Sequence, residues 1–211
     1  MSSRIPDAVE RSRRDLSGWL WHFCRRDGYP LNTLRAILES GHIRGGTDHF
    51  CQEVAVCLTE TPLTESIRQS GSLEKRNYTR LSDYGIGFRK EWVFARGGLP
   101  VIYQPASMRM QIPESMRWRH CELDYAKGID FTWQREWRVP GERLEFTHDD
   151  DVIVVVKTED EACQLLWSNM YTDDRHDEIF VDIDRSYVTH EMLTEDTAPH
   201  EIEVLRTRQD R

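Results

Sequence analysis

Short apolar runs separated by polar turns recur along this sequence and constrain its fold more than any other feature. The most apolar runs are residues 19–24, 54–59, 152–156 and 179–183, and none exceeds six residues. An apolar run of about four to eight residues is typical of a buried strand, whereas a helix needs about ten or more. Weaker strand patterns fall at residues 84–90, 100–103, 131–139 and 202–205. The sequence therefore predicts an α+β or mixed α/β fold with about seven short strands.

Two helices can be placed between these runs. Apolar residues recur at helical spacing from residue 31 to residue 40, and Gly41 follows where a left-handed cap belongs. This stripe consists of Leu31, Leu34, Ile37 and Leu38. Thr158 and Glu161 form a capping-box pattern after the run at residues 152–156, which predicts a helix to about Trp167.

The length and charge of the chain limit its class. We expect residues 1–15 to form a polar N-terminal segment and residues 16–211 to form one α+β domain. No apolar run approaches the roughly 20 residues that cross a bilayer, and residues 1–6 lead into charge rather than a signal-peptide core. We therefore expect a cytoplasmic protein without membrane contact. The net charge of −9 argues against a broad nucleic-acid footprint but leaves a local basic groove open.

The segment from Phe131 to Val139 carries the most distinctive candidate site residue, Glu136. If the segment is one strand, its side chains alternate between an aromatic face and a polar face. The polar face consists of Thr132, Gln134, Glu136 and Arg138. Glu136 is then a candidate catalytic carboxylate, fixed on rigid backbone and backed by aromatic packing. A solvated edge strand would show the same alternation, because antiparallel sheets often keep one wet face.

Polar residues also interrupt or end two of the apolar runs. His22 lies between aromatic residues, where an unpaired imidazole is costly to bury, so it is either a core histidine bonded to backbone carbonyls or a site residue. Thr59 and Glu60 follow the second run directly, and binding groups are common where a strand ends. Capping of a following helix explains Thr61 but leaves Thr59 and Glu60 unexplained.

Motifs of several common enzyme classes are missing. The sequence has no Gly-rich phosphate loop, no nucleophile elbow, no His-Glu-x-x-His motif and no dinucleotide fingerprint. Its cysteines and histidines lack the spacing of a standard metal site, so we expect no bound metal. What remains is a histidine on the first strand, a hydroxyl on the second and a glutamate on a late strand.

The order His22, Thr59 and Gln134-x-Glu136 resembles the three-part pattern of ADP-ribosyltransferases of the diphtheria-toxin and PARP type. In that family, a strand-borne His, a Tyr or Ser, and a Glu line an NAD cleft, and Thr59 stands here where Tyr or Ser is usual. The resemblance implies a mixed, mostly antiparallel split sheet of about seven short strands, flanked by helices.

A second resemblance covers roughly residues 19 to 157. Its segments are Trp21-His22-Phe23, Leu34-Arg35-Ala36-Ile37-Leu38-Glu39-Ser40-Gly41, Val56-Cys57-Leu58-Thr59-Glu60-Thr61-Pro62-Leu63, Tyr84-Gly85-Ile86-Gly87-Phe88-Arg89-Lys90 and Pro100-Val101-Ile102-Tyr103. In this order they resemble bacterial abortive phage resistance proteins of the AbiGi type. The resemblance implies a role in phage defence, through abortive infection or a toxin–antitoxin pair.

The transferase resemblance assigns a role to each candidate residue. Glu136 would face the positive charge that develops when the bond between nicotinamide and ribose breaks. His22 would donate to a ribose hydroxyl, and Gln134 would position the acceptor nucleophile. Arg138 or Lys90 would hold the pyrophosphate. The expected catalytic residues are Glu136, Gln134 and His22, and the expected cofactor-binding residues are His22, Thr59, Glu60, Tyr84, Lys90 and Arg138.

Three functions are compatible with these residues. The first is an NAD-dependent ADP-ribosyltransferase that modifies a protein or nucleic acid in phage defence. The second is a noncatalytic, antitoxin-like binding component with a cognate toxin or antitoxin as partner, and the acidic balance suits a protein that masks a basic partner. The third is a metal-dependent nuclease that uses Glu60, Asp130 and Glu136.

Overall fold

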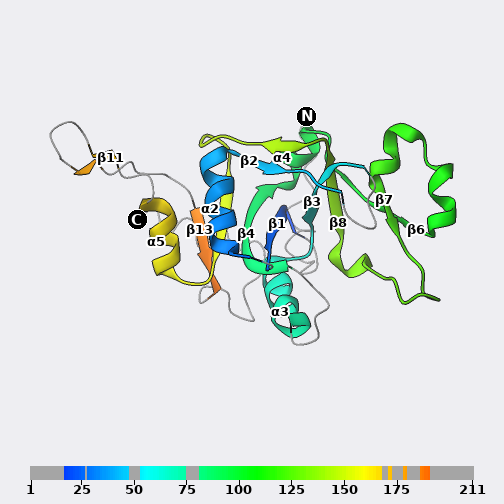
Figure 1. Cartoon of the computed structure of the whole chain (residues 1–211), viewed down its shortest axis with the longest axis horizontal. Helices are drawn as coiled ribbons and strands as arrows, with labels where there is room; N and C mark the ends of the chain where they lie inside the picture. The colour runs from blue at the N-terminus through cyan, green and yellow to red at the C-terminus, as the bar shows by residue number, and fades with distance from the viewer. Residues whose placement is uncertain are drawn as a thin grey trace, which may run out of the picture.

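A seven-stranded sheet organises the molecule (Figure 1). The computed structural model describes residues 17–26, 28–47, 53–74, 81–167, 171–172, 178–179 and 186–190. The strand order is β13–β10–β4–β1–β3–β8–β5. The strands are β1 (Trp19–Arg25), β3 (Ala55–Thr59), β4 (Leu81–Arg89), β5 (Leu99–Pro100), β8 (Glu136–Pro140), β10 (Val152–Val156) and β13 (Ser186–Thr189). Within the described strands of this sheet, β10 and β13 pair in parallel and the other neighbours pair antiparallel, so the prediction of a mixed, mostly antiparallel sheet is confirmed.

The structure also contains helices and short strand pairs outside this sheet. The helices are α2 (Pro30–Ser40), α3 (Leu63–Glu74), α4 (Lys90–Ala95) and α5 (Glu159–Trp167), with 3-10 helices η1 (Ala106–Gln111), η2 (Glu114–Arg119) and η3 (Thr132–Gln134). The strand pairs are β2 (His42–Arg44) with β9 (Arg143–Glu145), β6 (Ile102–Gln104) with β7 (His120–Glu122), and β11 (Tyr171–Thr172) with β12 (Glu178–Ile179). Within the described residues, hydrogen bonding runs through all seven strands of the main sheet without the expected split.

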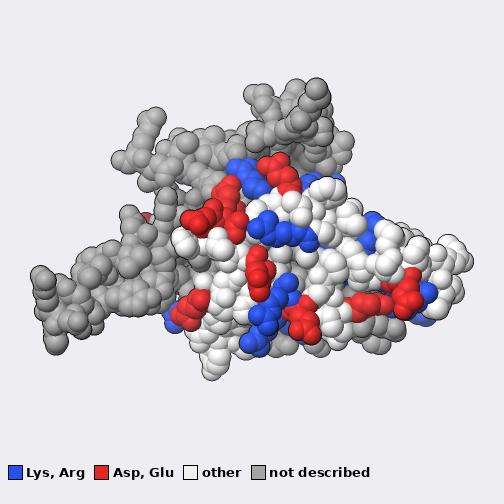
Figure 2. Space-filling view, turned by 90° about the horizontal axis from the view of Figure 1, so that it is seen from above, with Lys and Arg blue, Asp and Glu red and all other residues white. Residues whose placement is uncertain are grey.

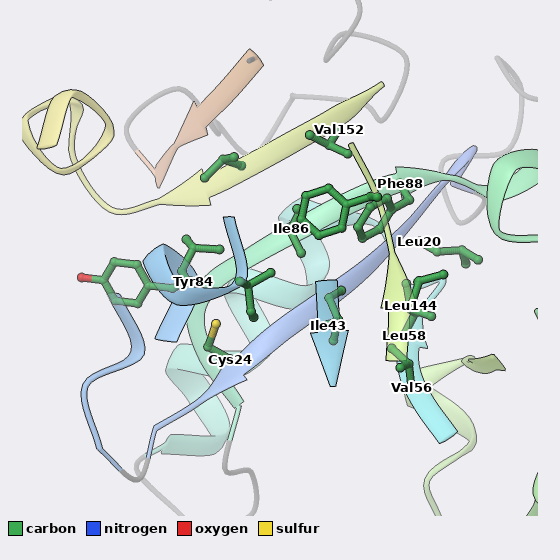
Figure 3. Packing of buried hydrophobic residues seen from close by; sticks show 14 of the residues in the cluster. Leu20, Cys24, Ile43, Val56, Leu58, Tyr84, Ile86, Phe88, Leu144 and Val152 are labelled. Atoms are coloured by element: carbon green, nitrogen blue, oxygen red, sulfur yellow. The ribbon is translucent and has the colours of Figure 1, made fainter. Parts of the chain in front are cut away.

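Each face of the sheet buries its own apolar cluster, because alternate side chains of a strand point to opposite faces. Trp19, Trp21 and Phe23 of β1 belong to the cluster that α3 covers. Leu20 and Cys24 belong to the larger cluster on the other face. Figure 3 shows the larger cluster, in which side chains from β1, β3, β4, β9 and β10 meet. Helices α2, α4 and α5 add apolar side chains to it, so both faces are covered.

Gly87 permits a close approach of β4 to β1. It pairs with Trp21, and a Cβ atom at Gly87 would lie 2.3 Å from the Trp21 ring. A glycine inside a strand often marks such an approach. The glycine pattern in the 84–90 run is therefore explained by packing against an aromatic ring within the sheet.

Several sequence predictions of local structure are confirmed. Helix α2 spans residues 30–40, and Gly41 has the left-handed φ of 64° expected of its cap. Helix α5 begins with the predicted capping box, since the Glu161 N–H donates to the Thr158 hydroxyl at 3.3 Å and the Thr158 N–H donates to the Glu161 carboxylate at 3.2 Å. The segment predicted as one strand at residues 100–103 instead divides between β5 and β6.

Some predictions lie outside the described residues, namely the N-terminal segment 1–15, most of the run 179–183 and the strand at 202–205. In the described ranges, no helix combines the length and the apolar character that crossing a bilayer requires.

Candidate functional site

Glu136 is the first residue of β8 and does not lie in the middle of a strand. The prediction of one strand from Phe131 to Val139 is wrong for its first half, which forms η3 and then a left-handed turn at Arg135 with φ 46°. Gln134 therefore does not share a strand face with Glu136. The second half is confirmed, because Glu136 and Arg138 share one face of β8.

Local turn chemistry explains this difference. The carboxylate of Asp130 accepts hydrogen bonds from the backbone N–H of Thr132 at 2.9 Å and from its hydroxyl at 2.7 Å. Short polar side chains that bond the backbone two residues later favour turns over strands. The N–H groups of Gln134 and Arg135 then donate to the carbonyls of Phe131 and Thr132, which closes the 3-10 turn.

The carboxylate of Glu136 is held by Arg138. Arg138 donates from Nε to Oε1 of Glu136 at 2.7 Å and from Nη2 to Oε2 at 3.3 Å. Its Nη1 also donates to the carbonyls of Trp118 at 3.0 Å and His120 at 2.7 Å. The Arg138 side chain is only 1% exposed. This guanidinium, predicted to hold a pyrophosphate, thus binds the protein's own carboxylate and backbone.

Tyr103 and His120 complete what we call the β8 cluster, which consists of Glu136, Arg138, Tyr103 and His120. The Tyr103 hydroxyl accepts the backbone N–H of Glu136 at 3.0 Å, and burial raises the pKa of Tyr103. Burial lowers the pKa of His120, although contact with the backbone of Pro105 acts in the opposite direction. Neither residue is identified from the sequence, because both reach β8 through long-range hydrogen bonds, from the Glu136 N–H to the Tyr103 hydroxyl and from Arg138 to the His120 carbonyl.

Thr59 lies beside Glu136, as the transferase resemblance implies. Trp21, Thr59 and Glu136 are direct neighbours across β1, β3 and β8, on the face covered by α3. The Thr59 hydroxyl donates to the backbone carbonyl of Gln134 and accepts the N–H of Thr61 at 3.1 Å. Thr59 and Gln134 therefore both lie near Glu136. The hydrogen bond from the Thr59 side chain to the Gln134 backbone connects β3 to the turn before β8.

His22 faces the other side of the sheet. It pairs with Ile86 and follows Leu20, both of which belong to the larger cluster, whereas Glu136 lies on the α3 face. The Nδ1 atom of His22 donates to the carbonyl of Cys57 at 2.9 Å. Burial lowers the pKa of His22, and this hydrogen bond partly offsets the effect. The structure therefore does not bring His22 to the same face as Glu136.

Glu60, Lys90 and Trp137 form a separate polar cluster. Glu60 accepts hydrogen bonds from Lys90 and, at 2.8 Å, from the indole N–H of Trp137. The Lys90 ammonium also lies 5.6 Å from the centre of the Trp137 ring. These contacts connect Lys90, the first residue of α4, to the end of β3 and to β8. Because Trp137 belongs to the larger apolar cluster, they lie on the face of the sheet opposite Glu136.

Tyr84 lies within β4, six positions before Lys90, which is the first residue of α4. Six positions correspond to about 20 Å along a strand. The Tyr84 hydroxyl donates to Glu161 of α5 at 2.7 Å, and burial raises the pKa of Tyr84. The residues predicted to bind one cofactor thus lie in separate places, each with a partner inside the protein.

The carboxylates of the nuclease hypothesis are likewise engaged elsewhere. Glu60 binds Lys90, Asp130 binds Thr132 and Glu136 binds Arg138. In the part of the chain that the structure describes, no three His, Cys, Asp or Glu side chains group as metal ligands.

Charges of both signs alternate on the face displayed in Figure 2, where Lys and Arg lie among Asp and Glu. Phosphate backbones bind to clustered basic residues rather than to such mixed surfaces. The displayed face therefore does not form an extended basic surface.

No protein-family model, curated protein or solved structure matches this chain.

Proposed function

We propose that this protein is a noncatalytic, antitoxin-like binding component of a bacterial phage-defence system, acting in the cytoplasm. The resemblance of residues 19–157 to AbiGi-type proteins supports the defence role. One observation favours binding over catalysis: the Glu136 carboxylate is bound on both oxygens by the buried Arg138.

Energetics favour the ion pair over a substrate contact. A hydrogen bond from a ribose hydroxyl to a carboxylate is worth about 1.5–3 kcal/mol. Removal of one member of a buried ion pair costs about 3–5 kcal/mol. A substrate that drew Glu136 away from Arg138 would therefore lose more than it gained.

The position of His22 supports the same conclusion. A catalytic pair that orients one ribose must reach it from one side of the sheet. Moving His22 to the Glu136 face would require a one-residue shift of β1, which would also remove Leu20 and Cys24 from the larger apolar cluster and the aromatic side chains of β1 from the cluster under α3.

Co-purification tests the proposal. The tagged chain is expressed together with its neighbouring genes and purified in mild buffer, and an unrelated tagged protein of similar net charge serves as the control. We expect the product of a neighbouring gene to elute with the chain as a stable complex and to be less toxic in its presence. A chain that elutes alone and leaves toxicity unchanged would contradict the proposal.

An NAD-dependent ADP-ribosyltransferase with an ADP-ribosyltransferase-like fold is the second candidate. It is favoured by the direct pairing of Thr59 with Glu136 on adjacent strands of a mixed sheet. Incubation with labelled NAD and lysate tests it. Label transfer and nicotinamide release that exceed those of a folded Glu136→Ala variant would favour this candidate over the first.

A further inference from the structure

Residues 102–122, here called the β6–β7 unit, lie beside the end of the main sheet that carries β8 and β5 (Figure 1). The unit consists of β6, η1, η2 and β7. Neither apolar cluster of the sheet includes any residue of this unit, which the structure describes throughout. Its own buried side chains are those of Ile112, His120 and Cys121. Elements with few buried apolar contacts open locally at a lower free energy than the core of the same protein.

Hydrogen bonds join the β6–β7 unit to two residues of β8. Arg138 donates from Nη1 to the carbonyls of Trp118 at 3.0 Å and His120 at 2.7 Å. The backbone N–H of Glu136 donates to the Tyr103 hydroxyl at 3.0 Å. These contacts reach β6, the end of η2 and β7, so one short stretch of β8 holds the unit as a whole.

His120 is the buried imidazole at this junction. The residue is only 3% exposed, and its Nε2 has no hydrogen-bond partner among the described residues. In the neutral form Nε2 can be the nitrogen without a proton, whereas a protonated imidazole carries an N–H on both nitrogens. A closed unit would then bury a cation and an N–H that lacks an acceptor, which is costly. Burial accordingly lowers the pKa of His120, and the carbonyls of Pro105 and Gln104 offset this only in part.

Two guanidiniums act on His120 from neighbouring elements. Arg109 of η1 and Arg138 of β8 both oppose a positive charge on the imidazole. Glu53 binds Arg109 and Glu136 binds Arg138, so both guanidiniums are held in place. The other titratable side chains at this junction lose their protons only above roughly pH 8, and they are Tyr103 on β6 and Cys121 on β7.

We propose that the β6–β7 unit opens away from β8 as a whole while the main sheet stays folded, and that protonation of His120 drives this opening. Opening takes His120 into water, where its positive charge is solvated. It also takes the carbonyls of Trp118 and His120 away from Arg138, so the buried pair of Arg138 and Glu136 becomes accessible. This conformational change is independent of whether the protein binds another protein or NAD.

The direction of the pH dependence follows from the lowered pKa of His120. The open unit binds a proton on His120 below pH 6.5, whereas the closed unit binds it only at lower pH. The stability of the closed unit is therefore fully present above pH 6.5 and is lost as the pH falls through the folded pKa. Because one proton is involved, the equilibrium constant for opening rises by at most about tenfold per pH unit.

Native-state hydrogen exchange of the full chain, followed by mass spectrometry from about pH 5 to about pH 7.5, tests the opening. Peptides of the unit are compared with peptides of β4, and each rate is corrected for the exchange of an unstructured chain at the same pH. We expect the N–H groups that pair β6 with β7 to share one protection factor, about tenfold or more below that of β4. We expect this factor to fall by up to about tenfold per pH unit below pH 6.5. Protonation of His22 acts on the sheet and is read from the β4 peptides.

Two variants separate the trigger from the attachment. His120→Gln removes the titration, and we expect the protection factor of the unit to lose its pH dependence. His148→Gln is the control, because the His148 side chain is 81% exposed, and it should keep that dependence. Tyr103→Phe keeps the ring but removes the hydroxyl that accepts the Glu136 N–H. We expect it to lower the protection factor of the unit about two- to tenfold and to leave its pH dependence unchanged.

The unmodified protein alone can overturn the proposal. If the unit and β4 show the same protection factor, the unit opens only when the whole protein unfolds, and the proposal fails. It also fails if the protection factor of the unit stays constant over this pH range. Among the variants, an unchanged pH dependence in His120→Gln would exclude His120 as the trigger. Equal effects of Tyr103→Phe on the unit and on β4 would exclude a separate opening.

Discussion

Removal of Arg138 gives the sharpest test of how Glu136 is used. Arg138→Met keeps a long side chain in the buried site but leaves the Glu136 carboxylate without its cation. It also leaves the carbonyls of Trp118 and His120 without their donor. The loss of one partner from a buried ion pair costs about 3–5 kcal/mol. For a chain of this size we expect the thermal unfolding midpoint to fall by about 6–20 °C.

Thermal and urea unfolding of matched variants would measure this cost. Arg143→Met is the control, because Arg143 is exposed and lies 3.9 Å from Glu145, and we expect it to change the unfolding free energy by less than about 0.5 kcal/mol. The double variant Glu136→Leu/Arg138→Met should be less destabilised than the sum of its single variants, by about 0.5–3 kcal/mol. An Arg138→Met variant that unfolds like the unmodified protein would refute the idea that this pair is structural.

Two further predictions concern β1. Gly87→Ala should lower the unfolding free energy by about 1–3 kcal/mol, because the added Cβ would collide with the Trp21 ring. Gly46→Ala is the control and should change the unfolding free energy far less, because a Cβ at Gly46 would meet no atom within 4 Å. Equal effects of the two substitutions would count against this packing. Because the pKa of His22 is lowered in the folded protein, the unfolded chain binds more protons than the folded protein as the pH falls below 6.5. The folded protein is therefore most stable above pH 6.5 with respect to this group, and that stability is lost as the pH falls through the folded pKa. In urea titrations at several pH values, His22→Gln should flatten this dependence by at most about 1.4 kcal/mol per pH unit, leaving the part due to His120. Identical slopes would be inconsistent with a lowered pKa of His22.

Local sequence patterns were sufficient for the elements whose signals lie close together in the chain. The capping box of Thr158 and Glu161 and the glycine after Ser40 each act within a few residues, and both helix ends lie where the pattern predicts. The continuous apolar run of β10 likewise matches a strand with buried side chains.

The segment before Glu136 could not be read from alternation alone. Its apolar and polar residues alternate as in a strand, but the bonds from Thr132 to Asp130 stabilise a turn instead. An Asp followed two residues later by Thr is a signal for such a turn, and it competes with the alternation. The prediction for Gln134 is wrong because the hydrogen bonds between Asp130 and Thr132 outweigh the strand tendency of the alternating pattern.

The candidate site depended on which face each strand presents, and that is a long-range property. Sequence order places His22, Thr59 and Glu136 on three strands but does not fix their registers. The observed registers put Thr59 beside Glu136 and His22 on the opposite face. A shift of one residue reverses the face of every side chain in a strand, so such predictions need the pairing itself.

Calorimetric titration of NAD into the purified protein tests the central claim, that Glu136 is held in a structural ion pair and that the protein acts by binding another protein. The account predicts no saturable heat of binding for the unmodified protein or for Glu136→Gln. Saturable NAD binding to the unmodified protein that disappears in a folded Glu136→Gln variant would contradict it.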